Sequence, residues 1–459
     1  MSQFNAFEKK MRAAGMGDAP VAVFKRNYEA LLRDETGMIP EQTIEPVAGL
    51  PKAEDLKMEK LPANLGEVVV IKLNGGLGTG MGLQGPKSLL DVRDGTNFID
   101  LMVRQILSLR HKSGRNVRLL LMNSFSTSQD TLDHLNRYKD EGLASADEVE
   151  MMQNMIPKID ANTLAPVSWP NDPEQEWCPP GHGDVYPALV GSGWLDRLLA
   201  DGVKYAFVSN SDNLGAILDP VLLDFFADSG APFLMEVTRR TAADKKGGHL
   251  AKRSRDGRLL LREVAQCPDD DLEEFQNIDK HRYFNTNNLW LNLEKLKAQL
   301  KADSGVLPLP MIKNKKTVDP REPQSTPVYQ LEIAMGSAIE CFEGALAIEV
   351  PRSRFAPVKT TADLLALRSD AYEVLSDGQV RLREERHGLP PDISFSGEYK
   401  LVDSLDELGV PSLLDCKSLK ISGLLHFEPG VVIVGDVIFQ NTSAGRKVVT
   451  AGTYKNGSY

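Results

Sequence analysis

The clearest hydrophobic pattern in the chain is an apolar, β-branched run at residues 68–73 that ends abruptly in glycines. A run without polar alternation predicts a strand buried on both faces. The next segment, residues 74–87, contains Gly75, Gly76, Gly78, Gly80, Gly82 and Gly85. Glycine lets backbone N–H groups approach an anion closely, so the pattern predicts a strand followed by a phosphate-binding loop. The alternative is a glycine-rich surface turn without a ligand.

Amphipathic helices and apolar strands alternate after this loop. Residues 96–112 carry apolar side chains on one side and precede Gly114, which predicts a helix with a glycine cap. A strand at 117–122 and a second helix through Tyr138 are expected next. Strands at 205–208, 233–239, 245–250 and 260–266 and a helix at 330–339 complete the expected core. Such alternation predicts an open, mostly parallel sheet with helices on both faces.

The two ends of the chain differ from this core. Residues 1–45 have a helical pattern, and residues 41–63 are expected to form a proline-containing loop. From about residue 386, two interleaved series of apolar residues recur every six positions, which is typical of a parallel β-helix. The series are Leu419, Leu425, Val431, Val437 and Ile421, Phe427, Ile433, Phe439. We therefore predict three parts, residues 1–48, 49–385 and 386–459.

Polar clusters follow several of the expected strands, where ligands of such sheets bind. Asp212 stands at the end of a central strand, a position suited to Mg²⁺, although an Asx-turn gives the same local sequence. His182 lies in a rigid Pro-Pro-Gly-His-Gly loop that favours a ligand contact, and Asp184 suits a helix N-cap. Residues 285–288 include three asparagines, whose paired donors and acceptors suit sugar hydroxyls.

Composition narrows the partners and the compartment. The 459 residues carry 53 basic and 64 acidic side chains, and the net charge of −11 argues against a nucleic acid partner. Four cysteines without metal-type spacing are consistent with a reducing cytoplasm. We expect no membrane span, because no apolar stretch approaches ~18 residues. The N-terminus also lacks the apolar centre of a signal peptide.

The spacing of the glycine loop excludes two common phosphate loops. Pro86 separates Gly85 from Lys87, which breaks the Walker A pattern, and no acidic residue follows at the distance that a dinucleotide site requires. The run Leu-Asn-Gly-Gly-Leu-Gly-Thr followed by Gly-Pro-Lys-Ser instead resembles the eukaryotic-type UTP:glucose-1-phosphate uridylyltransferases. The resemblance continues in order through residues 152–158, 179–186, 209–213, 284–290 and 350–361, and more weakly beyond.

This resemblance implies a fold and a reaction. The expected fold class is α/β: a Rossmann-like nucleotidyltransferase core with a mixed, mostly parallel sheet, an N-terminal helical segment and a short C-terminal parallel β-helix. The expected reaction is attack of glucose 1-phosphate on the α-phosphorus of UTP, giving UDP-glucose and pyrophosphate. Alternatives are a relative that uses another sugar phosphate, such as N-acetylglucosamine 1-phosphate, and a non-catalytic sugar-nucleotide sensor. A homo-oligomer through the C-terminal β-helix is a further expectation.

The resemblance also assigns residues. Lys87 and Lys359 are the expected catalytic cations, and Asp212 is the expected Mg²⁺ ligand. Nucleotide contacts are expected from Leu73, Asn74, Gly75, Gly76, Lys87, Gln153, Gly181, Asp212 and Lys359, with Gln153 reading uracil. Sugar phosphate contacts are expected from His182, Asn210, Asp212, Gly248, Glu263, Asn285 and Asn287.

Overall fold

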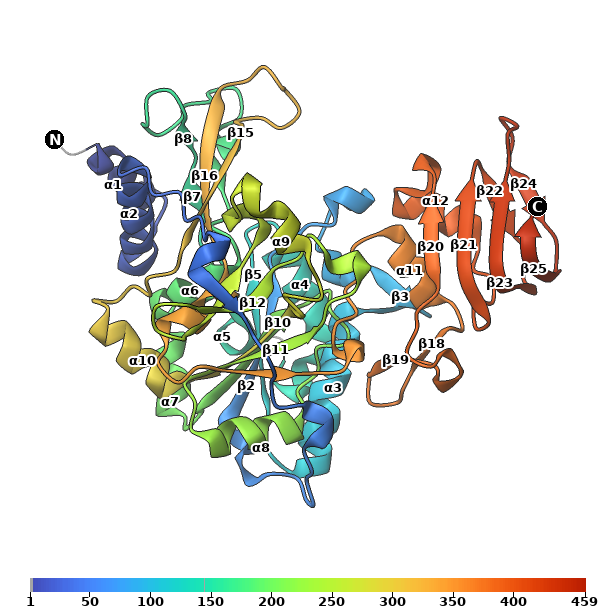
Figure 1. Cartoon of the computed structure of the whole chain (residues 1–459), viewed down its shortest axis with the longest axis horizontal. Helices are drawn as coiled ribbons and strands as arrows, with labels where there is room; N and C mark the ends of the chain where they lie inside the picture. Colours follow the sequence, from blue (N-terminus) through green and yellow to red (C-terminus); the bar gives the residue numbers. More distant parts are fainter. Residues whose placement is uncertain (1–2, 144) are drawn as a thin grey trace.

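The computed structural model describes residues 3–143 and 145–459, and Figure 1 shows a large central sheet between an N-terminal helical pair and a C-terminal group of strands. The central sheet has ten strands in the order β1-β12-β14-β10-β2-β5-β6, with β11, β13 and β17 attached beside this path. Its strands are β1 (Ile44–Pro46), β2 (Val68–Asn74), β5 (Arg118–Asn123), β6 (Glu150–Met152), β10 (Tyr205–Asn210), β11 (Phe233–Arg239), β12 (His249–Arg253), β13 (Leu259–Arg262), β14 (Tyr283–Asn292) and β17 (Leu346–Glu349).

Helices cover both faces of the parallel part of this sheet, as predicted. Along β2, Val68 and Val70 belong to one hydrophobic core, and Val69 and Ile71 belong to a second core on the opposite face. The first core includes α3 (Phe98–Ser113) and α8 (Pro220–Ser229), and the second includes α6 (Val185–Gly191), α7 (Trp194–Ala200) and α10 (Leu293–Ala302). The two cores explain why the sequence of β2 shows no polar alternation.

The sheet is mixed, as predicted, but the expectation that it is mostly parallel is wrong. β10, β2, β5 and β6 are parallel neighbours, and β11 is parallel to β17. In contrast, β14 runs antiparallel to β10, β11 and β12, and β12 runs antiparallel to β1 and β13. The second half of the sheet contains a hairpin and a long returning strand instead of helical crossovers, so all its pairs except β11 with β17 are antiparallel.

Several segments differ from the sequence predictions. The helix expected at 330–339 is wrong: the segment forms β16 (Pro327–Ile333), paired with β15 (Met311–Thr317), and then a 3-10 helix. The buried Leu331 and Ile333 alternate with polar residues, which is the period of a strand. Strand β1 lies within the segment expected to be a loop, and it pairs with β12. The strands expected at 245–250 and 260–266 are β12 and β13, whose boundaries along the sequence differ from the expected ranges.

The N-terminal helices form a small third core. Helix α1 (Phe4–Ala13) and helix α2 (Asp18–Leu32) pack through Phe7, Phe24 and Tyr28, and this core also includes the buried residues Ile156 and Leu331. The second of these helices ends at Leu32, and the chain then continues to β1.

The C-terminal residues form two parallel sheets at the opposite side of the molecule from α1 and α2 (Figure 1). One contains β20 (Asp392–Phe395), β21 (Cys416–Ser422), β23 (Val431–Gln440) and β25 (Gly452–Ser458), and the other contains β22 (Leu425–Phe427) and β24 (Lys447–Val449). All eight residues of the two hexad series are buried. A hairpin of β18 (Tyr372–Val374) and β19 (Val380–Leu382), with α11 (Thr361–Arg368) and α12 (Val402–Leu408), connects these sheets to the centre.

Candidate active site

The glycine-rich loop begins where β2 ends and turns back on itself. The backbone N–H of Lys87 donates to the carbonyl of Gly76 at 3.2 Å, and Leu77 pairs with Pro86. The loop thereby brings Lys87 beside the end of β2. Gly75 lies directly against Gln153, because a Cβ at Gly75 would lie 2.4 Å from Oε1 of Gln153 and would displace that side chain. The structure thus brings the expected phosphate loop and the expected uracil-reading residue together.

Lys87 and Asp212 form an ion pair at the carboxyl ends of β2 and β10. Their Nζ and Oδ2 atoms lie 2.7 Å apart, and both side chains are partly exposed. The backbone N–H of Ser211 donates to the carbonyl of Leu73, which joins the two strand ends. The second carboxylate oxygen of Asp212, Oδ1, is buried and has no hydrogen-bond partner. One oxygen of Asp212 is therefore left for another ligand.

Lys359 reaches the same edge of the sheet from a distant part of the sequence. The backbone N–H of Val358 donates to the carbonyl of Asp212 at 3.0 Å, and Pro357 pairs with Asn213. Lys359 itself is exposed. Burial raises the pKa of Glu263, and the charge of Lys359 lowers that pKa in part, which places the two side chains in one electrostatic environment.

The other two basic residues of the 350–361 segment have internal partners. Arg352 makes two hydrogen bonds to the carboxylate of Asp244, at 2.7 and 2.9 Å, and the buried Arg354 makes two to Glu236, at 2.6 and 2.7 Å. These pairs neutralise both arginines, so Lys359 supplies the positive charge of this segment at the edge of the sheet.

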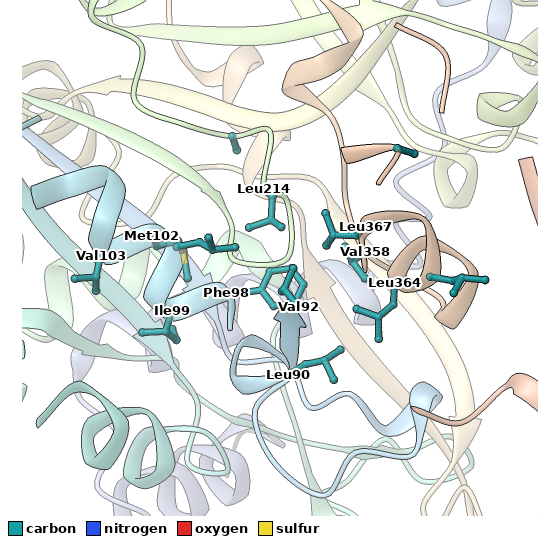
Figure 2. Close-up of a cluster of buried hydrophobic side chains, with 14 of the residues drawn as sticks. Leu90, Val92, Phe98, Ile99, Met102, Val103, Leu214, Val358, Leu364 and Leu367 are labelled. Carbon is teal, nitrogen blue, oxygen red and sulfur yellow. The ribbon is translucent and has the colours of Figure 1, made fainter. Parts of the chain in front are cut away.

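A cluster of buried hydrophobic side chains fixes Lys87, Asp212 and Lys359 relative to one another. Figure 2 shows Leu90, Leu214 and Val358 packed around Phe98 and Leu364. Leu90 follows Lys87 by three positions, Leu214 follows Asp212 by two, and Val358 directly precedes Lys359. The cluster therefore connects three segments that are far apart in the sequence.

The expected uracil site is built from the ends of two segments. Gln153 follows β6; its backbone N–H donates to Asn123 at 2.7 Å, and its side-chain Nε2 donates to the carbonyl of Gly181 at 3.4 Å. Gly181 has φ +84°, and a Cβ there would lie 2.5 Å from the carbonyl oxygen of Ile333. Only glycine fits this turn without strain.

The prediction that the Asp184 side chain caps a helix is wrong. Asp184 does precede α6, but its carboxylate makes no cap hydrogen bond. Instead it accepts from the backbone N–H of Asn154 at 2.7 Å and from the side-chain amide of Asn154 at 3.0 and 3.1 Å. Burial raises the pKa of Asp184 to about 7, and the Asn154 hydrogen bonds oppose this rise.

His182 is held as a neutral imidazole. Its Nδ1 accepts the backbone N–H of Met335 at 3.0 Å, so the proton of the neutral ring is on Nε2. Burial lowers the pKa of His182 to about 4. This environment makes His182 a fixed hydrogen-bond donor at neutral pH.

The expected sugar contacts surround a bulge in β14. Asn287 has φ +58°, and the pairing of β14 with β11 is irregular at this point. The side chains of Asn285 and Asn287 bond each other at 2.8 Å, and the backbone N–H of Asn285 donates to the carbonyl of Gly248. A Cβ on Gly248 would lie 2.5 Å from the Glu263 carboxylate. These four residues therefore form one cluster, and Asn210 lies at the end of the neighbouring strand β10.

Asn74 has a different environment from the other expected contacts. Its side chain is buried and donates to Asn123 at 2.7 Å and to Thr131 at 3.1 Å. The amide of Asn74 therefore joins β2 to β5 and α4 (Ser128–Leu135). Any contact of Asn74 with a nucleotide would use its backbone.

Two residues that support the site escaped the sequence predictions. Glu236, in the middle of β11, is 0% exposed and accepts hydrogen bonds from Asn288, Trp290 and Arg354. A glutamate between Met235 and Val237 in an apolar strand was the available signal. Ser124 donates from Oγ to the carbonyl of Gly75 at 2.9 Å, and its sequence context gave no comparable signal.

These features define the chain as an α/β protein with a glycine-rich loop and a cluster of charged residues at the carboxyl ends of its central strands, where ligands of such sheets bind. Residues 21–434 match the model of the UTP–glucose-1-phosphate uridylyltransferase family, and the chain belongs to this family. Proteins of that name from Solanum tuberosum and Saccharomyces cerevisiae are 44% and 42% identical to it, over 81% and 84% of this chain and 76% of each relative.

Solved structures agree with this assignment. A variant of UDP-glucose pyrophosphorylase from Leishmania major in complex with UDP-glucose has a TM-score of 0.93 and 46% identity, covering 100% of this chain and 99% of the other. UDP-glucose phosphorylase from Trypanosoma brucei has a TM-score of 0.90 and 47% identity, with coverage of 100% and 99%.

Proposed function

We propose that this chain transfers the uridylyl group of UTP to glucose 1-phosphate, releasing pyrophosphate and forming UDP-glucose. The observation that carries the proposal is the meeting of the glycine-rich loop, Lys87, Asp212 and the Lys359 segment at one edge of the sheet. The reaction brings two anions together. Its main obstacles are charge repulsion and the charge that spreads over the phosphates in the transition state.

The two lysines act on that charge. Lys87 and Lys359 flank the phosphates, while the backbone N–H groups of Gly75 and Gly76 hold the nucleotide next to Leu73 and Asn74. A phosphate oxygen of glucose 1-phosphate attacks the α-phosphorus of UTP in line, and pyrophosphate leaves. Since the nucleophile belongs to the substrate, the protein supplies orientation and positive charge and forms no covalent intermediate.

We further propose that Mg²⁺ binds at Asp212. The buried Oδ1 of Asp212 without a partner fits a metal ligand. Within residues 3–143 and 145–459, no group of three His, Cys, Asp or Glu side chains is arranged to hold a metal. Mg²⁺ suits such a site, because it uses one or two carboxylates and takes its other ligands from phosphates and water. When bound, the ion would neutralise phosphate charge.

The metal proposal has a direct test. Asp212→Asn keeps the shape of the side chain but weakens its affinity for Mg²⁺, so the Mg²⁺ concentration for half-maximal turnover should rise about tenfold or more. Mn²⁺ binding followed by electron paramagnetic resonance, in the presence of UTP, gives a second readout. Unchanged metal dependence in both measurements would remove Asp212 from the metal site.

Recognition of the two substrates uses different residues. We assign uracil to Gln153 and Gly181, and the sugar phosphate to His182 and Asn210. The hexose hydroxyls are assigned to the cluster of Gly248, Glu263, Asn285 and Asn287. The neutral His182 supports this assignment, because its Nε2–H can donate to a phosphate oxygen.

The finer features of the fold and setting are also part of this proposal. We infer a Rossmann-like nucleotidyltransferase core, a C-terminal β-helix and a cytoplasmic setting. The described residues contain no helix long and apolar enough to cross a membrane. A homo-oligomer is proposed through β25, the last strand in its sheet, because an edge strand presents backbone groups to a second copy. Light scattering with size-exclusion chromatography measures this directly.

A coupled assay of pyrophosphate release tests the reaction. We expect turnover with UTP and glucose 1-phosphate, and much weaker turnover when N-acetylglucosamine 1-phosphate replaces glucose 1-phosphate. Greater turnover with the acetylated sugar would favour a related transferase. Binding of UDP-glucose without turnover would favour a sensor.

A further inference from the structure

The link between Asp184 and Asn154 lies beside the expected uracil site, and no role has yet been assigned to it. Asp184 is 2% exposed, and the three hydrogen bonds that its carboxylate accepts all come from Asn154. A buried carboxylate is costly unless donors compensate it. The Asp184 carboxylate does not cap α6. Its hydrogen bonds instead stabilise the segment that follows β6.

This link fixes the residue that we assign to uracil. Gln153 directly precedes Asn154, and its own backbone N–H bonds the carbonyl of Asn123. Gln153 is thus held on one side by the end of β5 and on the other by Asp184. The side-chain amide then donates to the carbonyl of Gly181, in the loop that Asp184 ends.

The Gly181 loop is itself firmly placed. The backbone N–H of Ile333 donates to Pro180 at 2.9 Å, and that of Met335 donates to His182. A Cβ on Gly183 would lie 2.8 Å from Cγ1 of Ile333, which shows how closely the loop packs on β16. The Asp184 carboxylate therefore connects the Gln153 segment to a rigid support.

The orientation of the glutamine amide decides which pyrimidine base it can pair with. Rotating a glutamine amide by half a turn exchanges its donor and its acceptor with almost no change in shape. Uracil and cytosine exchange a donor and an acceptor at corresponding positions of the base. An amide that is free to rotate would pair with either base, whereas one held by the Gly181 carbonyl presents a single pattern.

We propose that Asp184 is a positioning residue for base selection, which holds Gln153 against the Gly181 loop so that UTP is preferred to CTP. The inference rests on the proposed function, because it requires Gln153 to read the base. Asp184 touches neither the base nor the reacting phosphates in this scheme. Its effect should therefore appear in base preference and in KM for UTP more than in kcat.

The test compares kcat/KM for UTP and for CTP in the full chain. Asp184→Asn removes the negative charge that holds the three donors of Asn154, and the new NH₂ group pairs with Asn154 only when the Asn154 amide turns over. We therefore expect the UTP to CTP ratio to fall about tenfold or more, with kcat for UTP changed less than about threefold. Adding Asn154→Asp to Asp184→Asn exchanges donor and acceptor, and this double variant should recover most of the ratio.

A matched control is Asp370→Asn. The Asp370 carboxylate likewise accepts three hydrogen bonds, from the backbone N–H groups of Leu413 and Leu414 and from Oγ of Ser412, but it lies in the connection to the C-terminal sheets. This control should keep the wild-type ratio. If Asp184→Asn does not fold, as judged by circular dichroism, Asn154→Ala carries the test, since it removes only the side-chain donors; it should lower the ratio too.

The possible outcomes separate the inference from the proposed function. An unchanged ratio in folded Asp184→Asn, or a loss that the double variant does not recover, would overturn the role of Asp184. Gln153→Ala tests the underlying assignment. If the wild-type ratio persists in Gln153→Ala, the assignment of uracil to Gln153 fails; if only Gln153→Ala loses the ratio, the assignment stands and the inference fails.

Discussion

At the scale of single residues, charge is concentrated where the proposed reaction needs it. Lys87 and Asp212 bond at 2.7 Å, with side-chain exposures of 17% and 21%. Ion pairs that water still reaches contribute about 1 kcal/mol or less, so a phosphate or a metal can replace either partner at little cost. In contrast, the buried pair of Arg354 and Glu236 is surrounded by further hydrogen bonds and serves the architecture.

The neutral state of His182 predicts a specific pH dependence. Because its pKa is lowered to about 4, His182 should not titrate between about pH 5.5 and about pH 8, and kcat/KM for glucose 1-phosphate should show no break from this group. His182→Gln should lower kcat/KM without changing the shape of the pH profile. A break near pH 6.5 in the wild type that is absent in His182→Gln would contradict the assignment.

The same shift affects stability in acid. A histidine in the unfolded chain has a pKa near 6.5, so protons bind the unfolded state more readily than the folded state. The free energy of unfolding should therefore fall as the pH drops from about 6.5 to about 4. His182→Gln should show a smaller decrease over that interval, measured by denaturant unfolding at each pH.

At the scale of elements, the glycine-rich loop and the strand ends form one unit. Gly75 lies against Gln153 and accepts a hydrogen bond from Ser124, while Gly80 has open space around the position of a Cβ. Two glycines of the same loop therefore have different roles. Gly75 allows close contact with Gln153, the residue that we propose reads the base, and Gly80 only shapes the loop.

This difference gives a matched pair of variants. In Gly75→Ala, the new Cβ would overlap Oε1 of Gln153, a flexible side-chain end that can move aside at small cost in stability. We expect KM for UTP to rise about tenfold or more, with the melting temperature within about 3 °C of the wild type. Gly80→Ala should leave KM nearly unchanged. Equal effects of both variants would contradict the proposed contact.

The sequence predicted the elements in which the spacing of apolar residues directly reflects which side chains are buried. The apolar run of β2 and the hexads of the C-terminal strands specify burial directly, and both were confirmed by the burial of their residues. The segment 330–339 failed because a short apolar run fits a strand and a helix equally. Gly336 in this segment did not indicate from the sequence that the chain packs closely there. In the structure, a Cβ on Gly336 would lie 2.9 Å from Nδ2 of Asn285.

Contacts between distant segments were harder to predict from sequence. The ion pair of Lys87 and Asp212 spans 125 residues, and the hydrogen bond from Val358 to Asp212 depends on the cluster in Figure 2. The family resemblance supplied their association before the geometry was known. The hydrogen bonds of Asp184 could not be predicted, because an aspartate that caps a helix and one that bonds a neighbouring loop have the same local sequence.

At the scale of the whole molecule, the C-terminal sheets share a hydrophobic core with the catalytic part. Leu419 and Phe427 of these sheets belong to the same buried cluster as Val70 of β2 and Val358 beside Lys359. The side chain of Thr361, at the start of α11, also donates to the carbonyl of Tyr399. The C-terminal part is therefore expected to unfold together with the catalytic part.

Leu419→Ala tests this coupling. The side chain is fully buried, so its truncation should lower the free energy of unfolding by about 2 to 5 kcal/mol. Activity and the far-ultraviolet circular dichroism signal, which includes the C-terminal strands, should be lost in one transition, at a lower temperature than in the wild type. The exposed neighbour Lys420 provides the control Lys420→Ala, which should change neither. Two separate transitions in Leu419→Ala would contradict a shared core.

The most direct test of the account is the turnover of Lys359→Ala with UTP and glucose 1-phosphate. Lys359 is exposed, so its removal should change the free energy of unfolding by no more than about 0.5 kcal/mol. Loss of a positive charge beside the reacting phosphates should lower kcat by about 10² or more. Near-normal kcat in the stable variant would contradict the convergence of Lys87, Asp212 and Lys359 on the nucleotide.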